Sequence, residues 1–207
     1  MTRRLLRTAF ALLLLAAVPL AFAADLKVAT VDMGQVTTKY EALQNRSKEL
    51  QDWLNKQQDY LTRLGDYLLL SDGNFAEVVT LLNTAPPLPA DKAARLKELG
   101  ELAVAKEDTF HQLESNPKRT PEEDEQYKSM GDQFTRGRER LSATRIKIGA
   151  DYDQQVTTAR EDFMKKVVEV TEALAKQDGY NLVLDSGVVL VGGTDITDKV
   201  LAKLNNK

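Results

Sequence analysis

The sequence predicts an α+β protein that is mostly helical, with a small β-containing body and one long antiparallel coiled-coil hairpin of helices. Short β-branched segments stand near both ends of the chain, at Leu26–Asp32 and Asn181–Val191. Runs with helical periodicity fill most of the interval between them. Aromatic residues make up 6% of the chain and charged residues 29%, which suits long solvent-exposed helices better than one large core.

The first 23 residues have the pattern of a cleaved export signal. A positive start at Arg3, Arg4 and Arg7 precedes an apolar run. This run, Ala9–Phe22, is shorter than the roughly 20 residues that a membrane anchor needs. Ala21-Phe22-Ala23 has the small-x-small form of a signal-peptidase site. We expect export to a bacterial periplasm, and the absence of cysteine fits this better than a disulfide-built scaffold.

The charge balance argues against nucleic acid as a partner. The formal net charge is −3, from 28 basic and 31 acidic residues. Removing the three arginines of the signal leaves 25 basic residues, so the mature chain carries −6. Proteins that bind nucleic acid usually present a basic surface instead.

A coiled-coil pattern runs from Val36 to Leu70, with apolar residues at alternating spacings of four and three. The nine seam positions are Tyr40, Leu43, Ser47, Leu50, Leu54, Gln57, Leu61, Leu64 and Leu68, of which two are polar. A neighbouring row spaced by seven contains Trp53, Tyr60 and Tyr67. These aromatic residues either pack against the returning helix, as such rows usually do, or face a cavity and bind an apolar guest.

The segment 71–121 is predicted to be a string of broken helices at the far, mobile end of the projection. Turn signals at Ser71–Asn74 and Ser115–Pro121 bound it, and three prolines in Asn83–Ala90 exclude a helix there. A separate domain is disfavoured because we expect it to have very few large apolar residues to bury.

One long helix is predicted from Pro121 to about Asp178. Thr120, Pro121 and Glu123 form a strong helix start, and Gly179 suits the residue after the helix end. Apolar residues recur at a spacing of eleven, as in Tyr152, Phe163 and Leu174. This spacing averages about 3.67 residues per turn, so the helix should run nearly straight. Gly131, Gly137 and Gly149 are expected to be weak points.

The C-terminal end is predicted to form a tight hairpin and a capped helix. Asn181–Asp185 and Val188–Val191 would be its strands, turning at Ser186-Gly187. Since an isolated hairpin is marginal in water, Leu26–Asp32 is expected to add a strand. Asp195 would cap the terminal helix. Residues 24–35 and 179–207 would thus form the body, and 36–178 would project from it.

A basic cluster, Arg136, Arg138, Arg140, Arg145 and Lys147, lies within the long helix. Arg138 and Arg145 are seven apart and can share a helix face. The cluster is either a solvated face balanced by acids such as Glu139 or a binding strip for acidic proteins or anionic lipid headgroups.

Catalytic chemistry is not indicated by the sequence. The single histidine, His111, has no cysteine or second histidine to form a metal site with. No phosphate-binding loop, dinucleotide fingerprint or nucleophile elbow occurs. We therefore expect neither an enzyme nor a cofactor.

Several segments resemble the Skp/OmpH family of periplasmic chaperones. The resemblance rests on KVATVDMGQV near the start and on EALAKQDGYNLVLDSGVVLVGG with DITDKVLAKLN near the end, around a long helical middle. It covers roughly Lys27–Leu54 and Val156–Asn205 well, whereas Tyr67–Gly137 is similar only in being helical.

The resemblance implies a homotrimer shaped like a jellyfish, whose strands build one body and whose helical hairpins surround a cavity. The family holds unfolded outer-membrane β-barrel proteins there without ATP. By this resemblance Asp32 and Asp185 cap structure at strand ends. The residues expected to build the trimer body are Val28, Val31, Leu182, Val183, Leu184, Val189 and Leu190.

Two functions follow as hypotheses. The first is a trimeric holdase that binds unfolded outer-membrane proteins through Trp53, Tyr60, Tyr67, Arg138 and Arg145. The second is a coiled-coil spacer or adaptor of the cell envelope, and a hydrolase is a remote third. Familiar members of the family are basic, so electrostatic capture by this acidic chain requires segregated charge.

Overall fold

The computed structural model describes residues 26–206, so the predicted signal peptide lies outside the described residues. The protein is mostly helical, with a small body of strands. In chain order the elements are β1 (Val28–Val31), α1 (Met33–Lys39), α2 (Glu41–Gly65), α3 (Asp72–Leu82), α4 (Ala90–Ser115), α5 (Pro121–Asp178), β2 (Leu182–Asp185), a short 3-10 turn (Ser186–Val188), β3 (Thr194–Asp195) and α6 (Thr197–Asn205). Within residues 26–206, no helix is long and apolar enough to cross a membrane.

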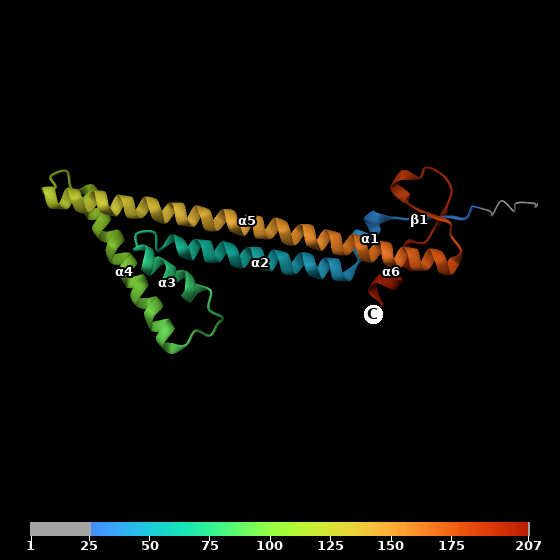
Figure 1. The fold of residues 1–207 in the computed structure, drawn as a ribbon, viewed down its shortest axis with the longest axis horizontal. Helices are drawn as coiled ribbons and strands as arrows, with labels where there is room; N and C mark the ends of the chain where they lie inside the picture. The colour runs from blue at the N-terminus through green and yellow to red at the C-terminus, as the bar shows by residue number, and fades with distance from the viewer. Residues whose placement is uncertain (1–25, 207) are drawn as a thin grey trace, which may run out of the picture.

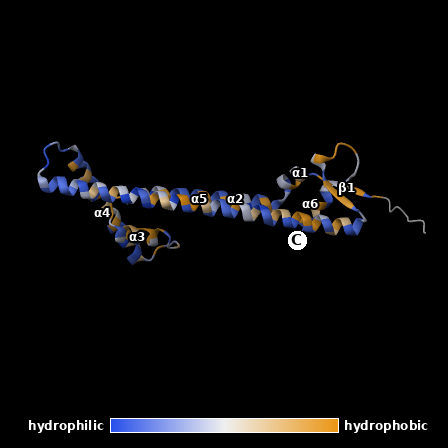
Figure 2. Cartoon of the chain, turned by 45° about the horizontal axis from the view of Figure 1, so that its top comes forward, coloured by the Kyte–Doolittle hydropathy of each residue, from blue (hydrophilic) through white to orange (hydrophobic). Residues whose placement is uncertain are grey.

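The molecule has three parts, which Figure 1 shows. The shaft consists of α2 and α5, which run side by side in opposite directions. The body, at one end of the shaft, contains the strands with α1 and α6. The arm is the pair α3 and α4, which leaves the shaft at an angle before α4 reaches the far end. Hydrophobic residues concentrate in the body and the arm, whereas much of the shaft surface is hydrophilic (Figure 2).

Helix α5 forms because its ends carry strong local signals. The Thr120 hydroxyl accepts from the Glu123 N–H, and the Glu123 carboxylate accepts from the Thr120 N–H at 2.7 Å. Gly179 ends the helix in the left-handed conformation with φ of 74°. The predicted bounds are confirmed, and the helix is continuous over 58 residues.

The seam of α2 packs along α5, as its heptad pattern predicts. Leu50 and Leu64 are buried, whereas the polar seam residue Ser47 is exposed. One break was not predicted: the helical run is interrupted at Tyr40, between α1 and α2. Asn205 of α6 stabilises the break, since its side chain donates to the Lys39 carbonyl and accepts from the Glu41 N–H, each at 3.1 Å.

The sheet of the body has the order β2-β1-β3, and both pairings are parallel. The predicted hairpin is therefore wrong, although Leu26–Asp32 does supply the partner strand. The chain turns after Asp185 into the 3-10 turn, and Val188–Val191 forms no strand. Parallel strands need a long connection, which the shaft supplies by carrying the chain out and back. Asn181, the residue before β2, then lies beside Lys27, and its N–H donates to the Lys27 carbonyl at 2.9 Å.

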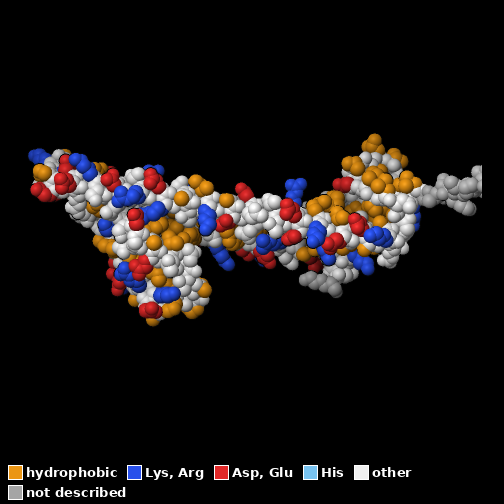
Figure 3. All heavy atoms as spheres, in the orientation of Figure 1, with side chains coloured by type: hydrophobic (Ala, Val, Ile, Leu, Met, Phe, Trp, Pro, Cys, Tyr) orange, Lys and Arg blue, Asp and Glu red, His pale blue; other side chains and the backbone are white. Residues whose placement is uncertain are grey.

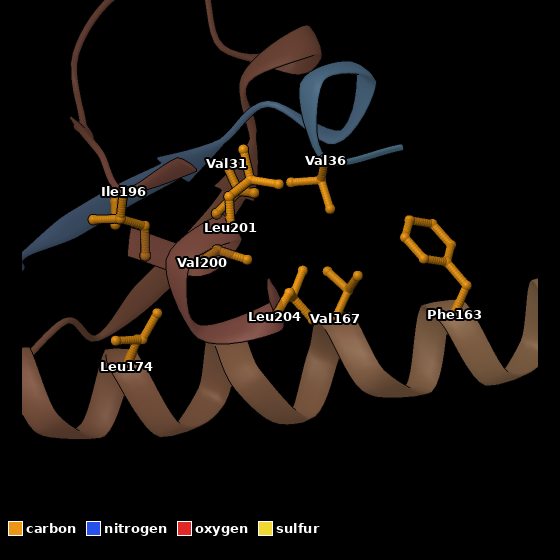
Figure 4. Packing of buried hydrophobic residues seen from close by; sticks show 10 residues of the cluster. Val31, Val36, Phe163, Val167, Leu174, Ile196, Val200, Leu201 and Leu204 are labelled. Carbon is orange, nitrogen blue, oxygen red and sulfur yellow. The ribbon is translucent and has the colours of Figure 1, made fainter. Parts of the chain in front are cut away.

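The body's core lies between the sheet, α5 and α6. Leu174, Val167 and Phe163 of α5 point toward α6 and β1 (Figure 4). The space is filled by Ile196, just before α6, and by Val200, Leu201 and Leu204 on the inner side of α6. Asp195 supports this helix, because its carboxylate accepts from the Thr197 N–H at 2.9 Å.

The arm has the predicted breaks between helices, at 83–89 and 116–120, but it corrects the expectation that this segment has very few large apolar residues to bury. It has a hydrophobic core of Leu64, Leu70, Phe75, Val78, Leu81, Leu99 and Ala103, partly covered by Tyr60, Tyr67 and Leu141. A second cluster at the far end contains Leu69, Leu113 and Met130 with Phe110, Tyr127 and Phe134. Large apolar residues are thus buried in the segment that we expected to lack them.

Gly137 is not a weak point of α5 but the place where the arm's junction approaches it. The residue is buried, and a Cβ added there would lie 2.8 Å from the Leu68 Cα. No larger residue fits this crossing of backbones. Arg140, one turn further, donates to the Asp72 carboxylate at 2.5 Å and to the Leu70 carbonyl at 3.2 Å. Its guanidinium also lies over the Phe75 ring.

Candidate functional site

The aromatic row of α2 is divided between two partners. Trp53 stacks on Tyr152 of α5, with ring centroids 6.4 Å apart. Tyr60 and Tyr67 instead pack against the arm's core, and the Tyr60 hydroxyl accepts from the Asn83 side chain at 3.2 Å. All three are half-buried, so each ring keeps an exposed part. The row therefore contributes to helix packing, and the arm is a partner for it that the sequence did not indicate.

The basic cluster of α5 is divided as well. Arg140 is fixed between the arm and the shaft and makes structural contacts. Arg138 and Arg145 are exposed, and Arg138 lies 5.9 Å from the centroid of the Phe134 ring. Neither of these two forms an ion pair within the part of the chain that the structure describes. They remain free to meet an acidic partner.

The residues predicted to build an intersubunit body differ in exposure. Val31 is 3% exposed and belongs to the core of its own chain. Val28, Val183, Leu184 and Val189 are half-buried. Leu182 and Leu190 are exposed, and Leu190 is wholly exposed. The apolar segment Val188–Val191 is therefore largely exposed to solvent, since Val188 is 76% and Val191 is 94% exposed.

A hollow of about 380 Å³ lies beside the outer strand β2. Its floor on α5 includes Met164, Val168 and Thr171, and Leu182 and Leu184 line the strand side. Sequence reasoning did not identify this face of α5. The sequence does contain a pattern for this apolar face, because Met164, Val168 and Ala175 recur at helical intervals. The pattern identifies an open face only once the structure shows which side of α5 is packed.

The arm carries a second, more open hollow. It is lined by Tyr67, by Leu88 and by Leu96, Gly100 and Val104 of α4. Gly100 leaves the helix surface bare next to the Tyr67 hydroxyl. Figure 3 shows hydrophobic side chains gathered at the body and again where the arm meets the shaft.

Carboxylates in the body stabilise strand and helix ends. The N–H of Gln35 donates to Asp32 at 2.9 Å and lowers the pKa of that carboxyl. The Thr197 hydroxyl and N–H lower the pKa of Asp195 in the same way. The hydroxyl oxygen of Thr197 also accepts from the Asp32 N–H at 2.8 Å, which joins β1 to α6. Asp185 accepts from the Gly187 N–H at 3.0 Å. These roles are structural, as we expected for Asp32 and Asp185.

No group of side chains suited to a metal ion occurs among residues 26–206. His111 is exposed on α4, where its Nδ1 lies 3.3 Å from a Glu114 oxygen and its Nε2 lies 3.8 Å from a Glu107 oxygen. The surfaces with the strongest functional signal are thus the apolar segment and hollow of the body and the exposed arginines of α5.

A family model described as outer membrane protein (OmpH-like) matches residues 88–204, more than half of the 207 residues. The chain belongs to the OmpH-like family. The OmpH-like match begins before α4 and ends in α6, so it includes most of the middle segment in which the sequence resemblance was weakest. No individual curated protein matches the chain.

Proposed function

We propose that the protein is an ATP-independent holdase of the periplasm that binds unfolded outer-membrane β-barrel proteins and prevents their aggregation. Membership of the OmpH-like family supports a role as a chaperone in outer-membrane protein assembly. The observation that carries the proposal is the open apolar segment Val188–Val191 on a body that a single chain leaves incomplete. Such a body suits an assembly whose shafts project together from one centre.

The assembly that we propose is a homotrimer. β2 is an edge strand of the sheet, and the hollow beside it is mostly apolar, with Glu172 and Asp185 also in its lining. The segment Val188–Val191 of a second copy is the right length and chemistry to cover the neighbour's β2 and hollow. Its exposed side chains each stabilise by about 1.5–3 kcal/mol when buried. Covering β2 also removes an edge that otherwise promotes aggregation.

The shafts of three copies would enclose a cavity for the client, by which we mean the unfolded outer-membrane protein. Many weak contacts on several shafts add up through avidity, so release needs no fuel. A client held this way keeps its unpaired strand edges away from those of other clients. The exposed parts of Trp53, Tyr60 and Tyr67, with Arg138 and Arg145, are candidate contacts.

Native mass measured by light scattering tests the proposal. Residues 24–207 are measured alone and after mixing with a urea-unfolded outer-membrane barrel protein that is diluted into buffer. We expect a mass near three chains that rises to a soluble complex with one client. A stable oligomer that leaves the client to aggregate would instead favour the envelope spacer, which binds one folded partner.

A further inference from the structure

The arm carries a mostly apolar hollow of about 820 Å³ that its own core does not fill, which we call the arm groove. The groove lies between Tyr67 and α4 and follows α4 from Ala93 to Asp108, a length of about 22 Å at about 1.5 Å per residue. On α4 the core residue Ala103 is 4% exposed, whereas the groove residue Val104 beside it is 59% exposed. The arm groove is therefore an open apolar surface on a unit that is already packed.

The middle of the arm groove has no side chain, because Gly100 lies there. A Cβ added to Gly100 would contact only the Tyr67 hydroxyl, at 3.7 Å. Leu96 and Val104 lie about one turn before and one turn after Gly100 on α4, and both line the groove. A large apolar side chain of a partner therefore fits over Gly100, between these two residues and the Tyr67 side chain.

Charge is distributed unevenly along the arm groove. Its lining contains one basic residue, Lys97, and two acidic residues, Glu101 and Asp108, so its net charge is −1. Lys97 and Glu101 pair with each other at 3.5 Å. Asp108, at the C-terminal end of the groove, forms no ion pair among the described residues. The other end, at Leu88 and Ala93, is uncharged, so a complementary partner needs a basic residue at one end only.

A helix suits the arm groove better than an extended segment does. The walls of the groove come from α4, from the turn after α2 and from the loop before α4, and they contain no strand. An extended segment would leave backbone N–H and C=O groups without partners against these apolar walls, which costs free energy. A helix satisfies its own backbone, and amphipathic helices bind apolar grooves through side chains spaced by three and four. The length of the groove corresponds to about four helical turns.

The arm groove lies outside the contacts between copies described above. In Figure 1 and Figure 2 the arm lies on the opposite side of the shaft from the loop that follows β2 and contains Val188–Val191. The contacts between copies use that loop and the hollow beside β2, which share no residue with the arm groove. Of the candidate client contacts, only Tyr67 lines the groove. A partner can therefore occupy the groove while the assembly and the other client contacts are kept.

We propose that the arm groove is a docking site for an amphipathic helix of a folded partner protein. The helix places a large apolar residue over Gly100 and a basic residue beside Asp108. Docking of this kind goes beyond the holding of unfolded clients, because one preformed groove selects one shape, whereas holding depends on many weak contacts on several shafts. Each copy of the chain carries one such groove, so an oligomer binds several partner helices at once.

Two synthetic peptides test the proposal. Both are helices of about four turns with leucines spaced by three and four on one face. One peptide carries lysines in its last turn, and the other carries glutamates there. Each is labelled with a fluorophore, and its dissociation constant for residues 24–207 is measured by fluorescence anisotropy. The lysine peptide should bind about tenfold more tightly than the glutamate peptide, because its charge complements the acidic end of the groove at Asp108.

Paired variants locate the binding. Gly100→Leu fills the middle of the groove and should weaken binding of the lysine peptide about tenfold, whereas Gly149→Leu, at an exposed position of α5 with nothing within 4 Å of an added Cβ, should not change it. Asp108→Lys should weaken the lysine peptide about threefold and strengthen the glutamate peptide by a similar factor, since exposed ion pairs contribute modestly. Asp52→Lys, at an exposed position of α2, should affect neither peptide.

A second pair of variants tests the groove without adding volume to it. Val104→Gln replaces an exposed apolar residue of the groove and should weaken the lysine peptide about threefold. Leu102→Gln replaces an exposed residue of the same helix that does not line the groove, and it should leave binding unchanged. Circular dichroism and thermal unfolding of each variant confirm that the arm stays folded.

Several outcomes would overturn the docking site. Equal binding of both peptides to the wild-type protein, or equal loss in Gly100→Leu and Gly149→Leu, contradicts it. Displacement of the lysine peptide by a urea-unfolded outer-membrane barrel protein would assign the groove to clients instead. A Gly100→Leu variant with a lower native mass than the wild type would make the groove an interface between copies. Client holding is measured separately on the wild-type protein, so its failure contradicts the proposed function and not the docking site.

Discussion

The two ends of the shaft complete their hydrophobic cores differently. At the arm end, Leu64, Leu70, Val78 and Leu99 are fully or almost fully buried within one chain. At the body end, a compact core of α5, α6 and β1 stands next to Val188, Leu190 and Val191, which are almost wholly exposed. The core at the arm end is therefore complete within one chain, whereas the body leaves apolar side chains exposed.

This difference separates what stabilises the fold from what assembles it. Burial of the arm's core contributes to the stability of a single chain. The apolar segment Val188–Val191 of the body contributes little to the stability of a single chain, and exposed apolar patches of this kind mark surfaces that a partner can cover. Substitutions at the two ends should consequently change different observables.

The largest effect is expected at the open segment of the body. Leu190→Asp places a charge where a second copy would bury it, which costs several kcal/mol per copy, on the order of 3. The native mass should fall to one chain, while the circular dichroism and the unfolding of the separated chain stay unchanged, because Leu190 contacts no core in its own chain. Lys203→Asp, at an exposed position of α6, is a control that should keep the native mass. A folded Leu190→Asp variant of unchanged mass would rule out this interface.

A somewhat smaller effect is expected in the arm. Leu99 is 1% exposed, and Leu99→Ala removes buried methyl groups and leaves a cavity, which should lower the free energy of unfolding by about 2–5 kcal/mol. Hydrogen exchange should show faster exchange in α3 and α4, while native mass and exchange in the body are kept. Leu102→Ala, on the exposed side of the same helix, should cost far less. Equal destabilisation by both would contradict the assignment of the arm's core.

The junction of arm and shaft should respond to one added methyl group. At Gly137, an alanine Cβ would clash with the Leu68 backbone, so Gly137→Ala should destabilise by about 1–3 kcal/mol despite the higher helix propensity of alanine. At Gly149, where nothing lies within 4 Å of an added Cβ, the same substitution should stabilise α5 by up to about 1 kcal/mol. Thermal unfolding of the two variants checks the predicted opposite signs.

Local signals explain which parts of the fold could be predicted. The ends of α5 are set by Thr120, Glu123 and Gly179, which act on their immediate neighbours. The seam of α2 is likewise visible because its period repeats within one element. The parallel sheet could not be inferred in this way. β propensity marks Val188–Val191 as a strand, but pairing depends on contacts between distant residues such as Asn181 with Lys27.

The arm and the candidate surfaces were hidden for the same reason. The arm's core takes Leu64 from α2, Phe75 from α3 and Leu99 from α4, so no single element shows its period. The row of Trp53, Tyr60 and Tyr67 was visible, but its division between α5 and the arm was not. Arg138 and Arg140 look equivalent in the sequence, and only the position of the arm distinguishes a free arginine from a structural one.

The smallest expected effect is an acid sensitivity confined to the body. Hydrogen bonds from Thr197 hold the pKa of Asp195 below its ordinary value of 3.8, and those from Gln35 do the same for Asp32. Since these folded-state pKa values are depressed, the stability that they contribute is present above pH 4 and is lost as pH falls through the lower folded values. The melting temperature of the body should therefore decline as the pH falls below about 4, and Asp195→Asn should make this decline shallower. The arm offers an internal comparison, because its Glu77 pKa is lowered by the exposed guanidinium of Arg95 and screening should make that contribution depend on salt. Acid loosening that begins in the arm at every salt concentration would reverse this order.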